Sequence, residues 1–330
     1  MATRTAPPTS LRPLPDMATW LNRLKLRHLN VLLTISRHES LTAAGTALRM
    51  SQPAVSKWLA DMEATLGVPL FARGKPLRPT PYANALLRHA ERILGEARSM
   101  HEAVEAVREG ALGIVRIGVM SAATSVLLPG AITALQRASP RLRMVVIEDI
   151  ATGLWARFAR GELDVIVGLL GDGALAGDQP SAALYAEPYR VVAGLGHPLA
   201  RRRSPTWDDA ARHPWILPPV NTPLRHAIDA TFNQAGVASP RPKLESVSFT
   251  TNLVLLRDDD SLAVISSSAA MHYQSLRVLR AVALEIRHGI GPVSMVWRDR
   301  QPPAEIARVL SALRACARRI ASRPPPAPQA

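Results

Sequence analysis

The sequence has one cysteine among 330 residues, few aromatic residues, and no long uncharged apolar run. A single thiol, Cys316, excludes an intrachain disulfide, so a reducing compartment is the simpler expectation. No segment approaches the roughly 18 apolar residues of a membrane-spanning helix. The opening residues, MATRTAPPTSLRPLPD, lack the apolar core of an export signal. We therefore expect a cytoplasmic protein with no membrane partner.

Motifs for catalysis, cofactors and metals are also missing. The sequence contains no GxSxG, HExxH or GxxxxGK[ST] pattern, and GLLGDG, at Gly168 to Gly173, does not have the GxGxxG spacing of a dinucleotide loop. The histidines His197, His213, His226 and His272 show no metal-ligand spacing. We expect a protein that is not an enzyme, with no cofactor and no metal.

A large positive charge is present instead. Forty Lys and Arg residues against 26 Asp and Glu give a formal net charge of +14 and a pI near 11.2. Such a surface attracts polyanions, which favours nucleic acid or an anionic membrane surface as a partner. A proteome rich in arginine would give the same charge without such a partner, so the charge alone does not decide.

Residues 24–81 have the pattern of a small helical domain with a hairpin. Apolar residues recur through Leu24 to His38, and LTAAGTALRM forms a second short helix. In SQPAVSKWL, Ser51 can cap a third helix, and Pro53 suits its first turn. Two short helices joined by a turn form a helix-turn-helix, and VPLFARGKPLRPT then predicts a wing. Residues 1–23 are expected to be a disordered tail.

Residues 82–110 predict one long helix with a coiled-coil seam. Its apolar residues alternate steps of four and three, the spacing of a dimer seam. They are Leu86, Ala90, Ile93, Ala97, Met100, Val104 and Val107. The helix therefore requires a partner, although a monomer could instead place this stripe against its own core.

Residues 111–321 alternate between strand and helix patterns. Runs such as IVRIGVM, MVVIE and LDVIVGLL are separated by helical segments, which predicts βαβ units on a parallel sheet. A second set follows from YRVVAGL onward, so two α/β halves with a cleft between them are expected. Residues 322–330 are too rich in proline to pack and are expected to form a disordered tail.

The segment Leu26 to His89 resembles the DNA-binding region of LysR-type transcriptional regulators. The motifs LRHL, SLTAAGTAL, SQPAVSK, LGVPLF and RPT follow the family's order and spacing, and HPLAR is similar further along. Ala83 stands where the family usually has glycine, and Trp58 where a polar residue is common. SQPAVSK together with LRPTPYANALLRHA is most similar to the branch named for regulators of a galactose-binding protein.

The resemblance implies an α+β multidomain protein. It would have an N-terminal winged helix-turn-helix, a long dimerisation helix, and a two-lobed α/β effector domain similar to type II periplasmic binding proteins. Its partners would be double-stranded DNA, a small-molecule effector and a second copy of the chain. Homotetramers and a contact with RNA polymerase are further expectations from the family.

Residues near the predicted recognition helix and wing are candidates for DNA contact. The outer face at the start of a recognition helix enters the major groove, and hydroxyls at helix starts can hold phosphate. Which contacts read bases and which hold phosphates stays open. The candidates are Thr42, Ser51, Gln52, Pro53, Ser56, Lys57, Arg73, Lys75, Arg78 and Thr80.

Hydroxyl and amide side chains that follow predicted strands are candidates for effector binding. In open α/β sheets, ligands bind beyond the carboxyl ends of strands, where helices begin. Hydroxyls and backbone N–H groups there favour an anion, so we expect a carboxylate or acidic sugar derivative, although these residues could be helix caps only. They are Ser121, Thr124, Ser125, Thr152, Asn221, Thr222, Thr250 and Thr251.

Two other functions are compatible with parts of this pattern. A protein that bends or coats DNA without sequence specificity could use the same helix-turn-helix, with a purely structural α/β part. A solute-binding protein could use the α/β part, but would need an export signal.

Overall fold

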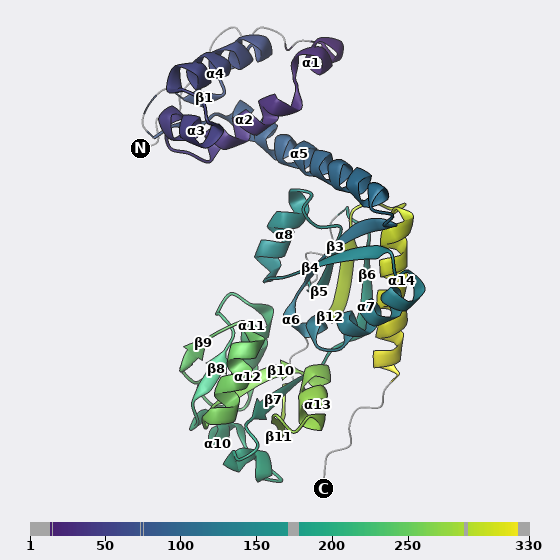
Figure 1. Cartoon of the computed structure of the whole chain (residues 1–330). Coiled ribbons are helices and arrows are strands. Elements are labelled where there is room, and N and C mark those ends of the chain that lie inside the picture. Colours follow the sequence, from purple (N-terminus) through teal and green to yellow (C-terminus); the bar gives the residue numbers. More distant parts are fainter. Residues whose placement is uncertain are drawn as a thin grey trace. The chain divides into compact units, whose positions relative to one another are not determined.

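The computed structural model describes residues 14, 16–72, 74, 76–170, 178–286 and 290–322. The chain divides into two compact units (Figure 1). The first comprises Met1–Glu102 with Ala159–Gly161, and the second Ala103–Phe158 with Glu162–Ala330. The long helix α5, Pro81–Arg108, passes from one to the other.

The first unit is a winged helix-turn-helix followed by most of α5. Its core is formed by the apolar faces of α2, α4 and the residues after α4, with Leu32, Ile35, Val55, Leu66 and Leu70 almost fully buried. The strands β1 and β2 pair antiparallel and form the wing. Before α5 the elements are α1 (Met17–Arg23), α2 (Leu26–Ser36), α3 (Leu41–Leu48), α4 (Gln52–Leu66), β1 (Phe71–Ala72) and β2 (Arg78–Pro79).

Helix α1 corrects one expectation from the sequence. The predicted disordered tail extended through residue 23, yet Met17–Arg23 are helical. The Asp16 carboxylate accepts a hydrogen bond from the backbone N–H of Thr19, 2.7 Å away, and caps the helix. Trp20 packs against the core of the first unit. This cap and the packing of Trp20 therefore order a segment that is too short to show a helical repeat of apolar residues.

The turn between α3 and α4 requires close backbone approach. Helix α3 ends at Arg49, whose φ of 56° is left-handed, and Ser51 caps α4 by accepting from the N–H of Ala54. Gly45 is buried in α3, and a Cβ added there would lie 2.8 Å from the Met50 carbonyl oxygen. Glycine is therefore required at this position by the tight return of the chain.

We predict that Gly45→Ala destabilises the chain by about 1 to 3 kcal/mol, because the added methyl group forces the turn apart. Helix propensity alone would give the opposite sign, a gain of about 1 kcal/mol. Urea unfolding measures the change. Ala47→Gly, at an exposed position of the same helix, is the control and should cost about 1 kcal/mol. A stabilised Gly45→Ala variant would contradict the steric explanation.

The second unit consists of two lobes, each built on a five-stranded sheet. In lobe 1 the strand order is β4-β3-β5-β12-β6. Helices α7 and α14 cover one face, and α8 covers the other, where Leu154 and Phe158 pack on Ile166 (Figure 1). Its elements are β3 (Gly113–Val119), α6 (Ser121–Thr124), α7 (Leu127–Ala138), β4 (Leu142–Glu148), α8 (Ala151–Ala159), β5 (Val165–Leu169), β6 (Ser181–Ala186), β12 (Pro292–Trp297) and α14 (Ala304–Ala321).

In lobe 2 the strand order is β11-β7-β10-β8-β9. Helices α10 and α11 bury Phe232 and its neighbours against one face, while α12 and α13 pack against the other. Its elements are β7 (Tyr189–Ala193), η1 (Pro198–Arg201), α10 (Trp207–Ala211), β8 (Trp215–Leu217), α11 (Pro223–Gln234), β9 (Leu244–Glu245), α12 (Phe249–Asp258), β10 (Leu262–Ser266), α13 (Ser267–Ser275) and β11 (Arg280–Glu285).

The sheets are mixed, whereas the sequence predicted parallel ones. Strand β3 is parallel to β4 and β5, but β12 lies antiparallel between β5 and β6. The chain leaves lobe 1 after β6, builds lobe 2, and returns through β12. The chain therefore passes between the lobes in two crossovers, once through residues 187–188 and once between β11 and β12. Among the described helices, none is both long and apolar enough to span a membrane.

Candidate DNA interface and effector cleft

The start of α4 presents polar side chains away from the core. Val55 is fully buried one turn into the helix, which fixes the orientation of the opposite face. On that face Gln52, Pro53 and Lys57 are exposed, and Ser56 is half-buried. The structure thus brings four predicted contact residues together at one helix end. Ser51 is also exposed there, but its hydroxyl already caps the helix.

The remaining DNA candidates lie around the helix starts and the wing. Thr42 is exposed in the first turn of α3, and Arg78 is exposed in β2. Arg73 and Lys75 lie outside the described residues. The Thr80 hydroxyl accepts from the N–H of Ala83 and donates to the Pro69 carbonyl, 2.7 Å away, so it has a structural role at the start of α5.

Glu63 connects the end of α4 to the segment that leads into β1. Its carboxylate oxygen Oε1 accepts from the backbone N–H of Leu70 at 2.6 Å and of Phe71 at 3.2 Å. This partly buried carboxylate fixes the segment leading into β1 against the end of α4. The sequence motif placed Glu63 before LGVPLF but gave no indication of this role.

Trp58 contacts His28 across the interface of α4 and α2. Their ring centroids are 4.5 Å apart in an edge-to-face arrangement. Burial lowers the pKa of His28, and the positive charges of Arg27 and Lys25 lower it further. The departure from the family pattern at Trp58 therefore contributes a packing contact between the two helices.

The predicted seam on α5 divides into a packed part and an exposed part. Ala90 is fully buried beside Leu29 and Leu33 of α2. Further along, four apolar side chains are between 44% and 73% exposed, although a stripe of this kind is ordinarily covered. They are Ile93, Met100, Val104 and Val107. Leu86 and Ala97 are half-buried.

A cleft of about 480 Å³ lies in the second unit, lined by residues of both lobes. This is the size range of sites for small metabolites. Of the residues predicted for effector binding, Ser121 and Thr152 line it from lobe 1. Asn221, Thr222 and Thr250 line it from lobe 2. Hydroxyls predicted from separate segments of the sequence are therefore brought to one cavity.

Three predicted effector residues do not line the cleft. Thr124, Ser125 and Thr251 are absent from its lining. The Thr124 hydroxyl donates to the carbonyl of Ser121, its own helix start, at 2.9 Å. Thr251 instead engages Ser248 through both its hydroxyl and its backbone N–H. Proximity in sequence to a strand end was not sufficient to direct these side chains into the cavity.

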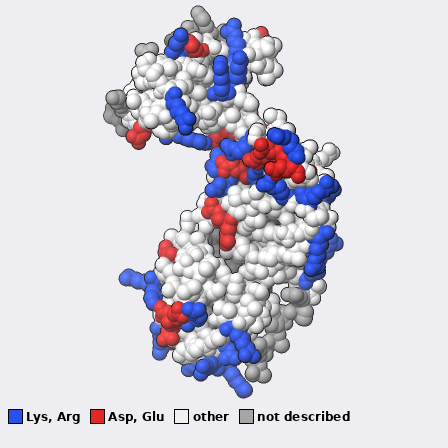
Figure 2. Space-filling view, in the orientation of Figure 1, with Lys and Arg blue, Asp and Glu red and all other residues white. Residues whose placement is uncertain are grey.

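Sequence reasoning missed the acidic residues of the lining. Glu148 is the last residue of β4 and Asp149 follows it, and both line the cleft from lobe 1. No lysine or arginine occurs among the described lining residues. In Figure 2 the hollow between the lobes has acidic atoms beside it and a mostly uncharged surround. The position of these carboxylates at the end of an apolar strand was a signal that could have indicated them.

The protein's own carboxylates occupy two helix N-termini near the cleft. Asp149 accepts from the N–H of Ile150 at 2.8 Å, and its Oδ2 would be only 2.2 Å from a Cβ on Gly153, so it lies over the first turn of α8. Glu187 accepts from the backbone N–H and the hydroxyl of Ser268, both at 2.9 Å, at the start of α13. Both positions would otherwise attract an external anion.

Glu187 is buried within the first crossover. It is 6% exposed and follows β6 of lobe 1, while its hydrogen-bond partner Ser268 belongs to lobe 2. The next residue, Pro188, accepts from the N–H of Ser267 at 2.8 Å. Burial raises the pKa of Glu187, and the hydrogen bonds from Ser268 oppose this in part. The pKa of Tyr185 is raised mainly by burial and then by the charge of Glu187.

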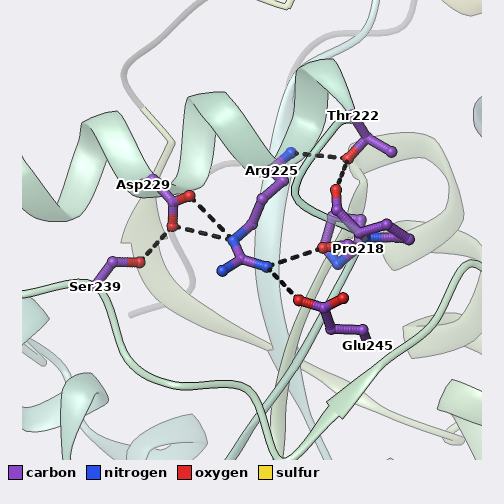
Figure 3. A network of polar contacts seen from close by, with 7 residues as sticks. Pro218, Thr222, Arg225, Asp229, Ser239 and Glu245 are labelled. Atoms are coloured by element: carbon purple, nitrogen blue, oxygen red, sulfur yellow. Dashed lines mark hydrogen bonds and ion pairs between the residues drawn. The ribbon is translucent and has the colours of Figure 1, made fainter.

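Arg225 is close to the cleft wall but directed into a polar network (Figure 3). Its Nε donates to Asp229 at 3.0 Å, and its Nη1 donates to the Pro218 carbonyl and to Glu245, both at 3.2 Å. The side chain is 10% exposed. The guanidinium thus fixes the segment at Pro218, which lines the cleft, and its charge is offset by two carboxylates.

In the described part of the chain, no group of three or more His, Cys, Asp or Glu side chains is arranged to hold a metal ion. The first unit thus offers a polar helix face, and the second unit a metabolite-sized cleft. A winged helix-turn-helix joined by a long helix to such a two-lobed domain defines a class, the ligand-responsive DNA-binding proteins.

Comparison with known proteins identifies the family. Residues 26–84 match the bacterial regulatory helix-turn-helix of the lysR family, and residues 98–318 match the LysR substrate binding domain. The chain belongs to the LysR family of transcriptional regulators. It is therefore a DNA-binding regulator with an effector-binding domain, and not an enzyme.

Curated relatives cover most of the chain. The transcriptional regulator GbpR of Azospirillum brasilense is 34% identical over 296 residues, which cover 89% of this chain and 86% of that protein. GalR of Pseudomonas putida is 28% identical over 297 residues, covering 89% of this chain and 73% of the relative.

Solved structures show the same fold. CbnR, a LysR family regulator, aligns with a TM-score of 0.63 at 18% identity, covering 89% of this chain and 99% of that one. ArgP from Mycobacterium tuberculosis aligns with a TM-score of 0.60 at 19% identity, covering 89% and 98%.

We predict that Glu187→Gln changes how stability depends on pH. Because the folded pKa of Glu187 is raised, the native state favours its protonated form. Its stabilising contribution is complete below the unfolded pKa of about 4.5 and is lost as the pH rises through the folded pKa. The free energy of unfolding of the wild type should therefore fall relative to that of Glu187→Gln above this pH.

Urea unfolding of both proteins across a pH series measures this difference. Groups that titrate elsewhere contribute equally to both proteins and cancel. A difference that stays constant, or that changes in favour of the wild type with rising pH, would contradict the assignment of a raised pKa.

Proposed function

We propose that this regulator recognises specific DNA sequences through the N-terminal end of α4, dimerises through α5, and responds to a small polar molecule held in the cleft between its lobes. The observation that carries this proposal is the exposed polar face of α4 at residues 52–57, held in place by the buried Val55. Cytoplasmic location, tetramer formation and a contact with RNA polymerase are further proposals that rest on the family.

DNA recognition by α4 is supported by the chemistry of its exposed end. Gln52 can form paired hydrogen bonds with an adenine edge, and Ser56 can donate to or accept from a base. Lys57 on the same face can contact guanine acceptors or phosphates. CbnR, which shares the fold, has been solved in complex with its target DNA. A protein that coats DNA without specificity would not require a metabolite-sized cleft.

We predict that Gln52→Ala and Ser56→Ala reduce discrimination between operator and random DNA, by about 1 to 3 kcal/mol for each base pair affected. Fluorescence anisotropy at several salt concentrations measures both affinities. Arg78→Ala is the matched control, since loss of a phosphate contact should weaken binding to all sequences and reduce the salt dependence. The same reasoning applies to Arg73 and Lys75. Equal losses on both DNAs for Gln52→Ala would remove it from base reading.

Dimerisation through α5 is supported by its uncovered apolar stripe. Ile93 and Met100 are 44% and 64% exposed in the protomer, and they are one heptad apart. A two-fold contact along this stripe would place two recognition helices on one face of DNA, at about the 34 Å spacing of successive major grooves.

We predict that the double variant Ile93→Asp, Met100→Asp is monomeric, because two buried charges in each protomer would oppose association. Sedimentation velocity gives the assembly state, and circular dichroism verifies that the exposed positions tolerate the change. Arg98→Asp, at an exposed position between them, should leave the dimer intact. An unchanged assembly in a folded double variant would exclude this stripe as the dimer contact.

Effector binding in the cleft is supported by its size and by hydroxyls from both lobes. From the sequence we expected an anionic effector, because helix N-termini were predicted around the site. Two observations oppose that choice. The described lining includes two carboxylates and no cationic side chain, and carboxylates already occupy the starts of α8 and α13.

A further inference from the structure

We infer that the effector is an electrically neutral, polyhydroxylated molecule whose hydroxyl groups donate to Glu148 and Asp149 and accept from the hydroxyl-rich wall of lobe 2. This inference rests on the proposed function of the cleft as the effector site. It replaces the carboxylate favoured by the sequence with a different class of ligand.

The acidic side of the cleft is not neutralised by the protein. Glu148 is exposed, and its side chain has no hydrogen bond or ion pair to another described residue. Asp149 is 4.0 Å from Arg157, but that guanidinium is closer to Glu162, at 3.2 Å. The described lining carries these two carboxylates and no lysine or arginine, so a ligand carboxylate placed beside Glu148 would meet like charge.

No cation compensates from the opposite wall. Arg225, behind Pro218, has its guanidinium engaged by Asp229 and Glu245. The described lining of lobe 2 is otherwise uncharged. Its polar side chains carry hydroxyl or amide groups, namely those of Tyr189, Asn221, Thr222, Ser246, Ser248, Thr250, Asn252 and Ser266.

The helix N-termini in lobe 2 favour a neutral ligand over a cation. Helices α11 and α12 begin at the cleft with Thr222 and Ser248 as caps, and each N-terminus carries roughly half a positive charge. This partial charge offsets the carboxylates across the cleft. The cavity therefore offers strong acceptors on one wall and donors on the other, and a hydroxyl group uses both because it donates and accepts.

The cleft also has apolar surface, which suits the C–H groups of such a ligand. Leu169, Ile216 and Phe249 line the cavity between the polar walls. A molecule with hydroxyls at its edges and C–H groups on its faces can contact both kinds of surface. The volume of about 480 Å³ admits a single sugar ring or a sugar alcohol of similar size together with bridging water.

The test uses the full-length protein and sets of matched probes. Aldohexoses and aldopentoses of both enantiomeric series, with their alditols, are each compared with the corresponding aldonate, uronate and 2-amino derivative by calorimetric titration and thermal unfolding. We expect at least one neutral probe to bind at least about tenfold more tightly than its own acids and amine.

Variants of the cleft then locate the bound probe. Glu148→Gln should weaken the neutral probe by about tenfold, since a charged acceptor is lost, and should reduce its advantage over the acids. Asp208→Asn, an exposed carboxylate outside the cleft lining, is the control and should change neither value.

The outcomes separate the two proposals. Tighter binding of an acid or an amine that is lost in Asn221→Ala would keep the cleft as the effector site and overturn neutrality. Absence of binding by every neutral probe would also overturn it. A neutral probe that binds unchanged to both Glu148→Gln and Asn221→Ala would instead refute the cleft as the site.

Discussion

The return of β12 into lobe 1 is the constraint on which the effector-binding part depends. Lobe 1 is completed only when β12 enters between β5 and β6, after the whole of lobe 2 has been built. The two lobes are therefore joined twice, which permits a rotation between them and opposes their separation. The cleft lies between the two lobes that these crossovers join. At the first crossover, Glu187 and Pro188 are both hydrogen-bonded to the start of α13, so this connection is anchored on the side of lobe 2.

The charge that the cleft can accept depends on which helix N-termini already have their N–H groups bonded to side chains of the protein. A helix N-terminus beside a cavity suggests an anion site, but only while its N–H groups are free. Here Asp149 covers α8 and Glu187 covers α13, whereas α11 and α12 are capped by the hydroxyls of Thr222 and Ser248. The nearby Arg225 binds the wall and does not face the cavity. The carboxyl groups at these two helix starts thus help to determine the charge that the cleft can accept.

Local motifs made the DNA-binding part predictable from the sequence. Ser51, Pro53 and the apolar spacing beginning at Val55 define the start and orientation of α4 without reference to distant residues. The cleft was only partly predictable, since Thr152 and Asn221 follow strands but so do Thr124 and Ser125, which face elsewhere. Helix α1 depends on one aromatic anchor, and the antiparallel place of β12 depends on pairing across more than a hundred residues. The Asp16 cap is a local signal for α1, but no local pattern encodes the packing of Trp20 or the long-range pairing of β12.

The junction at Thr80 has a mechanical consequence. Its backbone N–H bonds to the Leu70 carbonyl at 2.9 Å and its hydroxyl to the Pro69 carbonyl, while Glu63 holds the N–H groups of Leu70 and Phe71 from the other side. Hydrogen bonds around residues 69–71 therefore connect three segments: the first turn of α5, the strand β1 and the end of α4. Because of these connections, we expect a rotation of α5 to turn α4 and the wing together.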